Sequence, residues 1–360
     1  MTEPRNAGHR SVDIVVIGGG VAGAAAALAV ARRGVRVVVL ERSTAAGATG
    51  SSRGAARIYC PAAYPGEAYL EMGLRALERW RAIESQSGEQ LLCPTGALTI
   101  GKFALHELPS LREAAVEAEL LSPAQVGERF DIRIRDDRPL LYQPDAGVIR
   151  ADRALAALMR LTRDAGGELH TEEVTAMAER DEWLKIETNR GEWRCSAAIV
   201  AAGPWGGRLL AAAGIDVPLS VSRQSVAYFR LSDPSARPTA IMEFDADQPF
   251  ALWDPEHGLK AALHARGPLV DPDEPVLGAD TNAIDRIAEW VGERLPAAAP
   301  RLRATETCLY ANTPDERFIL ERRGRVVIAS ACNGQGFQFA SETGEQAARL
   351  ALAPSAVAVP

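Results

Sequence analysis

The sequence predicts an α/β fold in which a parallel sheet, built from both ends of the chain, is interrupted by an inserted antiparallel sheet. Two apolar runs predict strands over 12–17 and 35–40, and an alanine-rich helix is predicted between them over 21–33. From 218 to 265 the pattern changes to successive strands without intervening helices, which is typical of an antiparallel sheet. The run 325–330 then predicts a last strand of the first kind.

The turn after the first strand carries Gly18, Gly20 and Gly23, in the spacing G-x-G-x-x-G. The first glycine permits a tight turn, the second lets a pyrophosphate approach the backbone, and the third lets the helix pack closely on the strand. Glu41 ends the second strand, where a carboxylate can accept hydrogen bonds from both hydroxyls of a ribose. The sequence therefore predicts a Rossmann-type site for FAD or NAD rather than for NADP.

Hydrophobic periodicity predicts the remaining elements. Helices are expected over 68–85, 151–165, 281–295 and 341–350, with one or two more within 108–130. Strands are expected over 96–101, within 174–188, and over 197–203, 222–230, 239–244, 250–253 and 259–264. The stretch 43–57 is rich in Gly, Ala, Ser and Thr and is expected to form a loop over the cofactor.

This order of elements predicts two domains and two tails. A discontinuous cofactor-binding domain is expected over 12–85, 150–215 and 304–352, and a substrate domain over 86–149 and 216–303. Residues 1–11 and 353–360 are expected to be flexible tails.

The composition argues against several classes of partner. A net charge of −7 does not favour nucleic acid or an acidic membrane. The five cysteines form no C-x-x-C pair and the histidines are dispersed, so neither a disulfide framework nor a metal site is expected. Residues 1–11 lack the apolar segment of a signal peptide, and the longest apolar stretch, 24–31, is too short to span a bilayer. We expect a cytoplasmic protein that is a monomer or a small homo-oligomer.

Six further segments point to one family. They are GSSRGAARIY at 50–59, PTGALTIG at 94–101, RQ at 223–224, GLKAALH at 258–264, CLYANTPDERF at 308–318 and GQGFQF at 334–339. Together they resemble the monomeric sarcosine oxidase and N-methyltryptophan oxidase family, within the D-amino-acid oxidase and glycine oxidase superfamily. The likeness runs from about residue 12 to residue 352. It implies a D-amino-acid oxidase-like fold, bound FAD, and oxidation of an amine C–N bond with O2 reduced to H2O2.

The resemblance also implies which residues contact FAD. Cys308 matches the position at which the family forms a thioether to the 8α-methyl group of the flavin, a bond that needs a soft thiolate; an inert buried cysteine is the alternative. The loop at 334–336 would direct backbone N–H groups and a helix N-terminus at the flavin. The expected cofactor-binding residues are Gly18, Gly20, Val21, Ala22, Gly23, Glu41, Arg42, Ser51, Ser52, Val174, Gly203, Cys308, Gly334, Gln335, Gly336, Phe337 and Gln338.

Four residues are expected to take part in catalysis. Lys260 matches a lysine that contacts flavin N5 through water and promotes reduction of O2, because a fixed cation stabilises developing negative charge; a solvated surface lysine is the alternative. Arg57 matches an arginine near the flavin face, and a surface ion pair is its alternative. His264 matches an active-site histidine but could equally be a core residue, and Tyr310 belongs to the Cys308 motif.

The substrate-binding positions depart from the family. Sarcosine oxidases hold the substrate carboxylate with two cations, and these positions are Cys60 and Gln338 here; a family histidine is replaced by Gln335. Neither cysteine nor glutamine can form the charge-assisted pair that a carboxylate needs. The substrate is therefore expected to lack the usual carboxylate, or to bind it through another cation such as Arg53, Arg223 or Arg230.

The leading hypothesis is an FAD-dependent oxidase of a secondary amine or of a bulkier or cyclic N-substituted amino acid, with the imine hydrolysed in water. One alternative is a flavin amine dehydrogenase that uses an acceptor other than O2, against which Lys260 argues. Another is a non-catalytic or NAD-binding module, against which the Cys308 motif argues.

Overall fold

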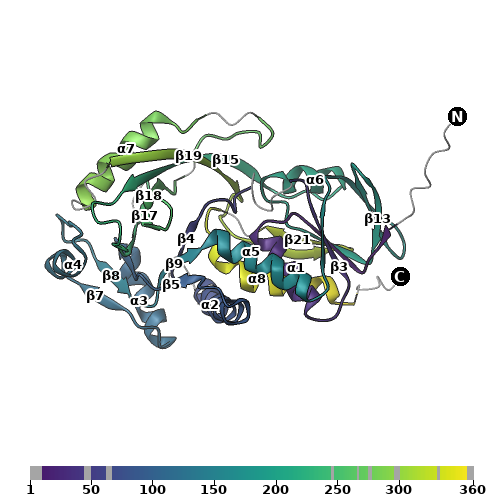
Figure 1. Ribbon diagram of the computed structural model, residues 1–360, viewed down its shortest axis with the longest axis horizontal. Coiled ribbons are helices and arrows are strands. Elements are labelled where there is room, and N and C mark those ends of the chain that lie inside the picture. Colours follow the sequence, from purple (N-terminus) through teal and green to yellow (C-terminus); the bar gives the residue numbers. More distant parts are fainter. Residues whose placement is uncertain are drawn as a thin grey trace. The chain divides into compact units, whose positions relative to one another are not determined.

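The computed structural model of the chain describes residues 10–43, 50–61, 67–244, 247–265, 267–274, 278–295, 301–330 and 333–354. It divides into two compact units (Figure 1). The first unit comprises Met1–Arg53, Leu155–Ser220 and Ala311–Pro360, and the second comprises Gly54–Ala154 and Val221–Tyr310. The sequence analysis assigned cofactor binding to one domain and substrate binding to the other. The two compact units do not test those assignments, so the expected domain boundaries stay a prediction.

The first unit is built on a six-stranded sheet with the order β10-β3-β2-β14-β21-β20. All neighbours in this sheet are parallel except β20, which pairs antiparallel with β21. The strands are β2 (Ile14–Ile17), β3 (Val37–Glu41), β10 (Glu168–Thr171), β14 (Ala197–Val200), β20 (Ile319–Arg323) and β21 (Val326–Ser330). The parallel strands expected from apolar runs are confirmed, and the central ones are wholly buried as those runs require.

Two helices from opposite ends of the sequence, α1 (Val21–Ala31) and α8 (Gly336–Leu352), lie side by side in the first unit (Figure 1). Every residue of α1 except Ala22 is buried. A Cβ atom placed on Gly344 of α8 would stand only 2.6 Å from the Cβ of Ala25. The alanine-rich sequence of α1 and this glycine therefore allow the two helices to approach closely.

A smaller sheet in the first unit has the order β1-β13-β12-β11. Its strands are β1 (Arg10–Ser11), β11 (Val174–Glu179), β12 (Leu184–Thr188) and β13 (Gly191–Cys195). Arg10 and Ser11, which the sequence analysis assigned to a tail, form a strand that pairs parallel with β13, and the guanidinium of Arg10 pairs with the buried carboxylate of Glu172. The tail residues 1–9 and 355–360 lie outside the described residues.

The second unit contains an eight-stranded sheet with the order β19-β15-β18-β17-β16-β6-β8-β7. Its strands are β6 (Ala97–Ile100), β7 (Glu119–Leu121), β8 (Leu140–Gln143), β15 (Ser220–Arg230), β16 (Ala240–Glu243), β17 (Pro249–Asp254), β18 (Gly258–Leu263) and β19 (Arg301–Asn312). The paired strands β15, β18, β17 and β16 are antiparallel, which confirms the expected change of pattern after residue 218.

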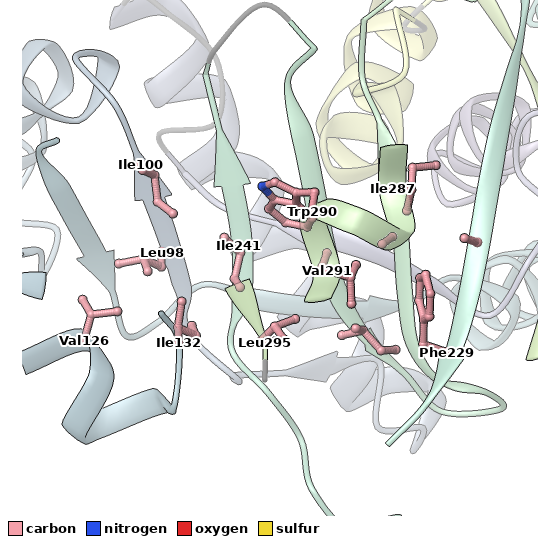
Figure 2. Packing of buried hydrophobic residues seen from close by; sticks show 14 of the residues in the cluster. Leu98, Ile100, Val126, Ile132, Phe229, Ile241, Ile287, Trp290, Val291 and Leu295 are labelled. Carbon is pink, nitrogen blue, oxygen red and sulfur yellow. The ribbon is translucent and has the colours of Figure 1, made fainter. Parts of the chain in front are cut away.

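One face of this sheet is covered by α7 (Thr281–Arg294). Leu98, Phe229 and Ile241 on the strands pack against Ile287 and Val291 of the helix and its neighbours (Figure 2). The second unit thus has a core between this sheet and α7, and a second apolar cluster that includes Met242 and Leu252 covers the alternate strand positions. Lys260 is the register partner of Leu252 and shares that second face.

Glu243 of β16 forms a hydrogen-bonded ion pair with α7 that holds the helix on the sheet. Glu243 is 4% exposed and accepts hydrogen bonds from Trp290 Nε1 at 2.7 Å and from Arg294 Nε at 2.5 Å. Burial acts to raise the pKa of Glu243, but hydrogen bonds from Arg294 and Trp290 lower it below its usual range. The carboxylate is therefore fully paired and belongs to the packing of the helix on the sheet.

A three-stranded sheet, β4-β9-β5, completes the second unit. Its strands are β4 (Ala56–Tyr59), β5 (Leu92–Cys93) and β9 (Gly147–Arg150). The loop expected over 43–57 therefore ends earlier than expected, because β9 supplies hydrogen-bond partners for Ala56 and Arg57. Residues 44–49 of that stretch lie outside the described residues.

The remaining helices are α2 (Glu67–Ser87), α3 (Phe103–Glu113), α4 (Pro123–Phe130), α5 (Ala151–Asp164) and α6 (Gly206–Ala212). The one or two helices expected within 108–130 are α3 and α4, which β7 separates. In the part of the chain that the structure describes, no helix is both long enough and apolar enough to cross a membrane.

Acid should weaken the first unit through Glu172. Burial acts to raise the pKa of this carboxyl, but hydrogen bonds from Arg10, Thr188 and Trp193 lower it from 4.5 to about 2. Because the folded pKa is depressed, the stabilisation is present above pH 4.5 and is lost as the pH falls towards 2. A shift of this size corresponds to about 3 kcal/mol of unfolding free energy.

Urea unfolding between pH 2.5 and 7 checks this expectation. The free energy of unfolding should fall more steeply below pH 4.5 in the wild-type protein than in Glu172→Gln. Glu168→Gln removes an exposed carboxylate from the adjacent strand and serves as the matched control. Equal pH dependence in the wild-type and Glu172→Gln proteins would contradict the assignment.

Candidate active site

The glycine turn between β2 and α1 leaves no room for side chains. Gly18 has φ of +102°, and a Cβ atom there would stand 2.5 Å from the carbonyl oxygen of Ala201. A Cβ atom on Gly23 would stand 2.0 Å from the carbonyl oxygen of Gly18. Both glycines are thus required by close approach of backbone to backbone.

The N-terminus of α1 has the properties of an anion site. Its N-cap residue, Gly20, has no side chain to cap the helix, and no acidic residue occupies the first turn. The amide of Val21 donates to Ser52 Oγ at 3.0 Å. Backbone N–H groups and the positive end of the helix dipole therefore face a position at which a pyrophosphate would be stabilised.

Glu41 lies next to this turn, at the end of β3. Its carboxylate accepts a hydrogen bond from the amide of Gly19 at 2.7 Å, and others from the amide and hydroxyl of Ser43 at 3.0 Å each. Two carboxylate oxygens can accept about four hydrogen bonds, so acceptor capacity is left for a ribose. The residues of the first unit fit the pyrophosphate and ribose of FAD.

Other expected cofactor residues also lie in the first unit. The guanidinium of Arg42 lies 3.6 Å from the ring centroid of Trp205, and Gly203 begins the short 3-10 helix η1 (Gly203–Trp205). Val174 begins β11. Ala22 lies in α1 and Ser51 in the turn before β4.

A second helix N-terminus is presented by α8. Gln335 is its N-cap residue and makes no side-chain capping bond, and the first turn again lacks an acidic residue. Gly334 has φ of +74°, and Phe337 and Gln338 are buried. Asn333 fixes the loop, since its Oδ1 accepts from the amide of Thr313 at 2.8 Å. The segment 334–338 thus ends in a helix N-terminus within the first unit, and its contact with the flavin stays a prediction.

Lys260 and Arg57 lie together in the second unit. Lys260 is only 6% exposed, and its Nζ donates to the carbonyl oxygen of Ala56 at 3.3 Å. Nη1 of Arg57 donates to the same oxygen at 2.8 Å. Burial, followed by the charge of Arg57, lowers the pKa of Lys260 to about 7. The alternative of a solvated surface lysine does not fit this burial.

Tyr310 and His264 also approach each other in the second unit. Their ring centroids are 5.7 Å apart with an interplanar angle of 49°. Burial and the neighbouring Cys308 raise the pKa of Tyr310. The four residues expected to be catalytic thus lie within one unit and on or beside the strands β4, β18 and β19.

Cys308 differs from the other described cysteines. Cys60, Cys93 and Cys195 are buried, whereas Cys308 is half-buried on β19. Burial raises the pKa of Cys93 and, to about 12, that of Cys195, so these thiols are inert. Cys332 lies outside the described residues.

Cys60, which the resemblance assigned to substrate binding, lies in a closed, apolar environment. Cys60 is fully buried in an apolar cluster with Val148 and Trp253, and its Sγ accepts a hydrogen bond from Gln143 Nε2 at 3.0 Å. Arg223 is half-buried on β15. In the described part of the chain, no group of three or more potential metal ligands gathers.

Sequence analysis missed two polar residues in the second unit. Tyr228 is the register partner of Lys260 across β15 and β18, and its hydroxyl donates to Glu306 at 2.7 Å. The sequence did contain a signal for Glu306. Side chains alternate between the two faces of a strand, so Glu306, Cys308 and Tyr310, each two residues apart, share one face of β19.

Comparisons with known proteins identify a family that binds the cofactor expected at this site. A family model described as DAO, FAD dependent oxidoreductase, matches residues 13–350. The chain is 30% identical to the peroxisomal sarcosine oxidase of Homo sapiens, covering 92% of this chain and 90% of that protein. It is 27% identical to the N-methyl-L-tryptophan oxidase of Salmonella enteritidis PT4, covering 94% of each chain.

Solved structures give the same result. NikD, described as an unusual amino acid oxidase essential for nikkomycin biosynthesis, is 28% identical and superposes with a TM-score of 0.86, covering 97% of this chain and 95% of that one. Glycine oxidase from Geobacillus kaustophilus has a TM-score of 0.81 at 18% identity, covering 95% of each chain, and so shows likeness of fold.

Proposed function

The chain belongs to the DAO family of FAD-dependent oxidoreductases, and from this premise we propose that it is an oxidase of a secondary amine or N-substituted amino acid other than sarcosine. It acts on amines or amino acids with FAD as its cofactor, as its relatives do. What we propose beyond the family is that O2 is the electron acceptor, that the substrate is of the stated kind, and that the flavin is bound covalently. The observation that carries it is the buried Lys260, which shares one carbonyl with Arg57.

The chemistry divides between the cofactor and the residues of the chain. FAD, when bound, supplies a two-electron acceptor for the hydride on the carbon next to the substrate nitrogen. Overall, the amine, O2 and water give a carbonyl compound, the shorter amine and H2O2. The glycine turn and Glu41 would hold the pyrophosphate and ribose. The loop before α8 would stabilise negative charge on the reduced ring.

Lys260 is proposed to act on oxygen. Reduction of O2 develops negative charge, and a cation fixed in a dry site stabilises that charge without rearrangement. The low exposure of Lys260 supplies such a site. A dehydrogenase with another acceptor has no need of it, which favours the oxidase over that alternative.

Replacing Lys260 by Met should slow reoxidation of the reduced enzyme by O2. We expect a loss of about 2–4 kcal/mol in activation free energy, or roughly 30- to 900-fold in rate constant. Stopped-flow measurement should show anaerobic reduction by substrate nearly unchanged. Lys102→Met, at an exposed lysine, is the control. Equal losses in both half-reactions, or no H2O2 formed per substrate consumed, would overturn the proposed role.

Cys308 is proposed to carry the flavin as an 8α-thioether, because it is the half-buried cysteine in the motif described above. Acid-precipitated wild-type protein should stay yellow, and its intact mass should include one FAD. Cys308→Ala should release all flavin into the supernatant, whereas Cys93→Ala should retain it. Free flavin in the supernatant of the wild-type protein would show that FAD is held without a covalent bond.

Sarcosine should be a poor substrate, because Cys60 and Gln338 are neutral. Each missing charge-assisted hydrogen bond costs about 1.5–3 kcal/mol, so two of them should place kcat/KM for sarcosine roughly 100- to 20,000-fold below that for the preferred substrate. A peroxide assay over N-methyl, bulkier N-substituted and cyclic amino acids measures this difference.

The missing cation at Gln338 can be tested by substitution, whereas the one at Cys60 cannot. Gln338→Lys should raise kcat/KM for sarcosine, and Gln338→Met is its uncharged control. Cys60→Arg would place a charge in an apolar cluster and is expected to destabilise the fold. Efficient oxidation of sarcosine by the wild-type protein contradicts the proposed substrate class.

A further inference from the structure

Two cations in the second unit are held close together. Nζ of Lys260 and Nη1 of Arg57 share the carbonyl oxygen of Ala56, at 3.3 and 2.8 Å, so the two nitrogen atoms lie within about 6 Å of each other. Arginine does not lose its proton in proteins, whereas a buried lysine does. The repulsion and the burial therefore both favour the neutral form of Lys260, which could not stabilise negative charge.

A carboxylate lies beside this pair. A Cβ atom placed on Gly54 would stand 3.6 Å from Nη1 of Arg57, 3.7 Å from Oε1 of Glu306 and 3.8 Å from the hydroxyl of Tyr228. These three polar atoms therefore surround one glycine. Glu306 is thus close to Arg57, on the strand that also carries Cys308.

Tyr228 fixes the position of this carboxylate. Its side chain is 4% exposed, and its hydroxyl donates to Oε1 of Glu306 at 2.7 Å. Its backbone pairs directly with Lys260 across β15 and β18. The ring also packs on the ring of His257, with centroids 4.3 Å apart. Tyr228 is therefore held by its backbone pairing and by the ring of His257, and its hydroxyl fixes the position of the Glu306 carboxylate.

We propose that Glu306, held by Tyr228, is the counter-charge that keeps Lys260 protonated for reaction with O2. It is a positioning residue, and the inference rests on the proposed function of Lys260. In support, burial and Arg57 lower the pKa of Lys260, and Cys308, Glu306 and Asp254 act in the opposite direction.

The other groups that face Lys260 are less suited to this role. Cys308 carries no charge once it forms the proposed thioether. Asp254, on β17, is held in place because its Oδ1 accepts from the amides of Glu256 and His257 and lies 3.1 Å from the His257 ring. Its Oδ2 is buried and has no hydrogen-bond partner in the part of the chain that the structure describes, but its effect on the pKa of Lys260 is smaller than that of Glu306. His264 and Tyr310, on β18 and β19, carry no negative charge at neutral pH.

The lysine content of the chain makes a direct test possible. The sequence contains three lysines, Lys102, Lys185 and Lys260. NMR of the holoenzyme labelled with 13C at lysine Cε should therefore give three signals, and the signal missing in Lys260→Met identifies Lys260. In the wild-type protein this signal should titrate with a pKa of about 7.

Glu306→Gln should lower this titration midpoint by about one to two pH units. Glutamine keeps an oxygen that can accept from Tyr228, so the fold is expected to be retained. Tyr228→Phe should lower the midpoint by a smaller amount, because it frees the carboxylate without removing it. Glu256→Gln, which removes an exposed carboxylate from the turn between β17 and β18, should leave the midpoint unchanged.

The rate constant for reoxidation by O2 provides a second measurement. It should fall as the pH rises through the Lys260 midpoint, and this fall should move to lower pH in Glu306→Gln. An unchanged Lys260 midpoint in Glu306→Gln overturns the inference and leaves the proposed function intact. If Lys260→Met is reoxidised by O2 with the same rate constant as the wild-type protein, the proposed function of Lys260 is overturned, whatever the NMR titration gives.

Discussion

Close approach of backbone to backbone is the constraint on which the first unit depends. Gly18 approaches Ala201, Gly23 approaches Gly18, and Gly344 approaches Ala25 more closely than any side chain would allow. These contacts bring the turn, the sheet and the paired helices α1 and α8 together. The turn also places Gly20, which has no side chain, at the start of α1 and no acidic residue in the first turn of the helix, an arrangement that suits a phosphate group. Packing and cofactor recognition therefore rest on the same glycines.

The second unit is distinguished by charged side chains that are buried or partly buried. Glu243 accepts hydrogen bonds from Trp290 and Arg294 of α7, and this group packs the helix on the sheet. On the strands β18 and β4, by contrast, Lys260 and Arg57 are like charges that share one acceptor. Such an arrangement is unfavourable for stability, and proteins retain unfavourable buried charges mainly where a reaction uses them. This contrast separates the structural ion group from the candidate catalytic one.

The sequence predicted those parts of the fold that local pattern determines. The apolar runs at β2, β14 and β21 are short and rich in β-branched residues, which favours buried strands, and the spacing of Gly18, Gly20 and Gly23 indicated a specific turn. It did not predict β4, because a segment rich in glycine and serine becomes a strand only when β9 lies beside it. Nor did it predict the contact of Tyr228 with Glu306, since these residues are 78 positions apart and meet only through strand order. The roles assigned to Lys260 and Arg57 by resemblance agree with the burial of Lys260 and with the acceptor that the two residues share, and their chemistry stays a prediction.

The pairing of α1 with α8 has a consequence for how the chain is made. The sheet of the first unit takes β2 and β3 from the first residues, but β20, β21 and α8 from the last ones. During synthesis, the surface of α1 that packs on α8 and the edge of β14 that pairs with β21 have no native covering until residues 326–352 have emerged. The segments of the second unit are complete once residue 310 has been made. Contacts between such distant residues are slow to form and leave apolar surface exposed in the meantime. The unit that contains the glycine motif should therefore be the last to fold, and chaperones should be needed mainly for its N-terminal part.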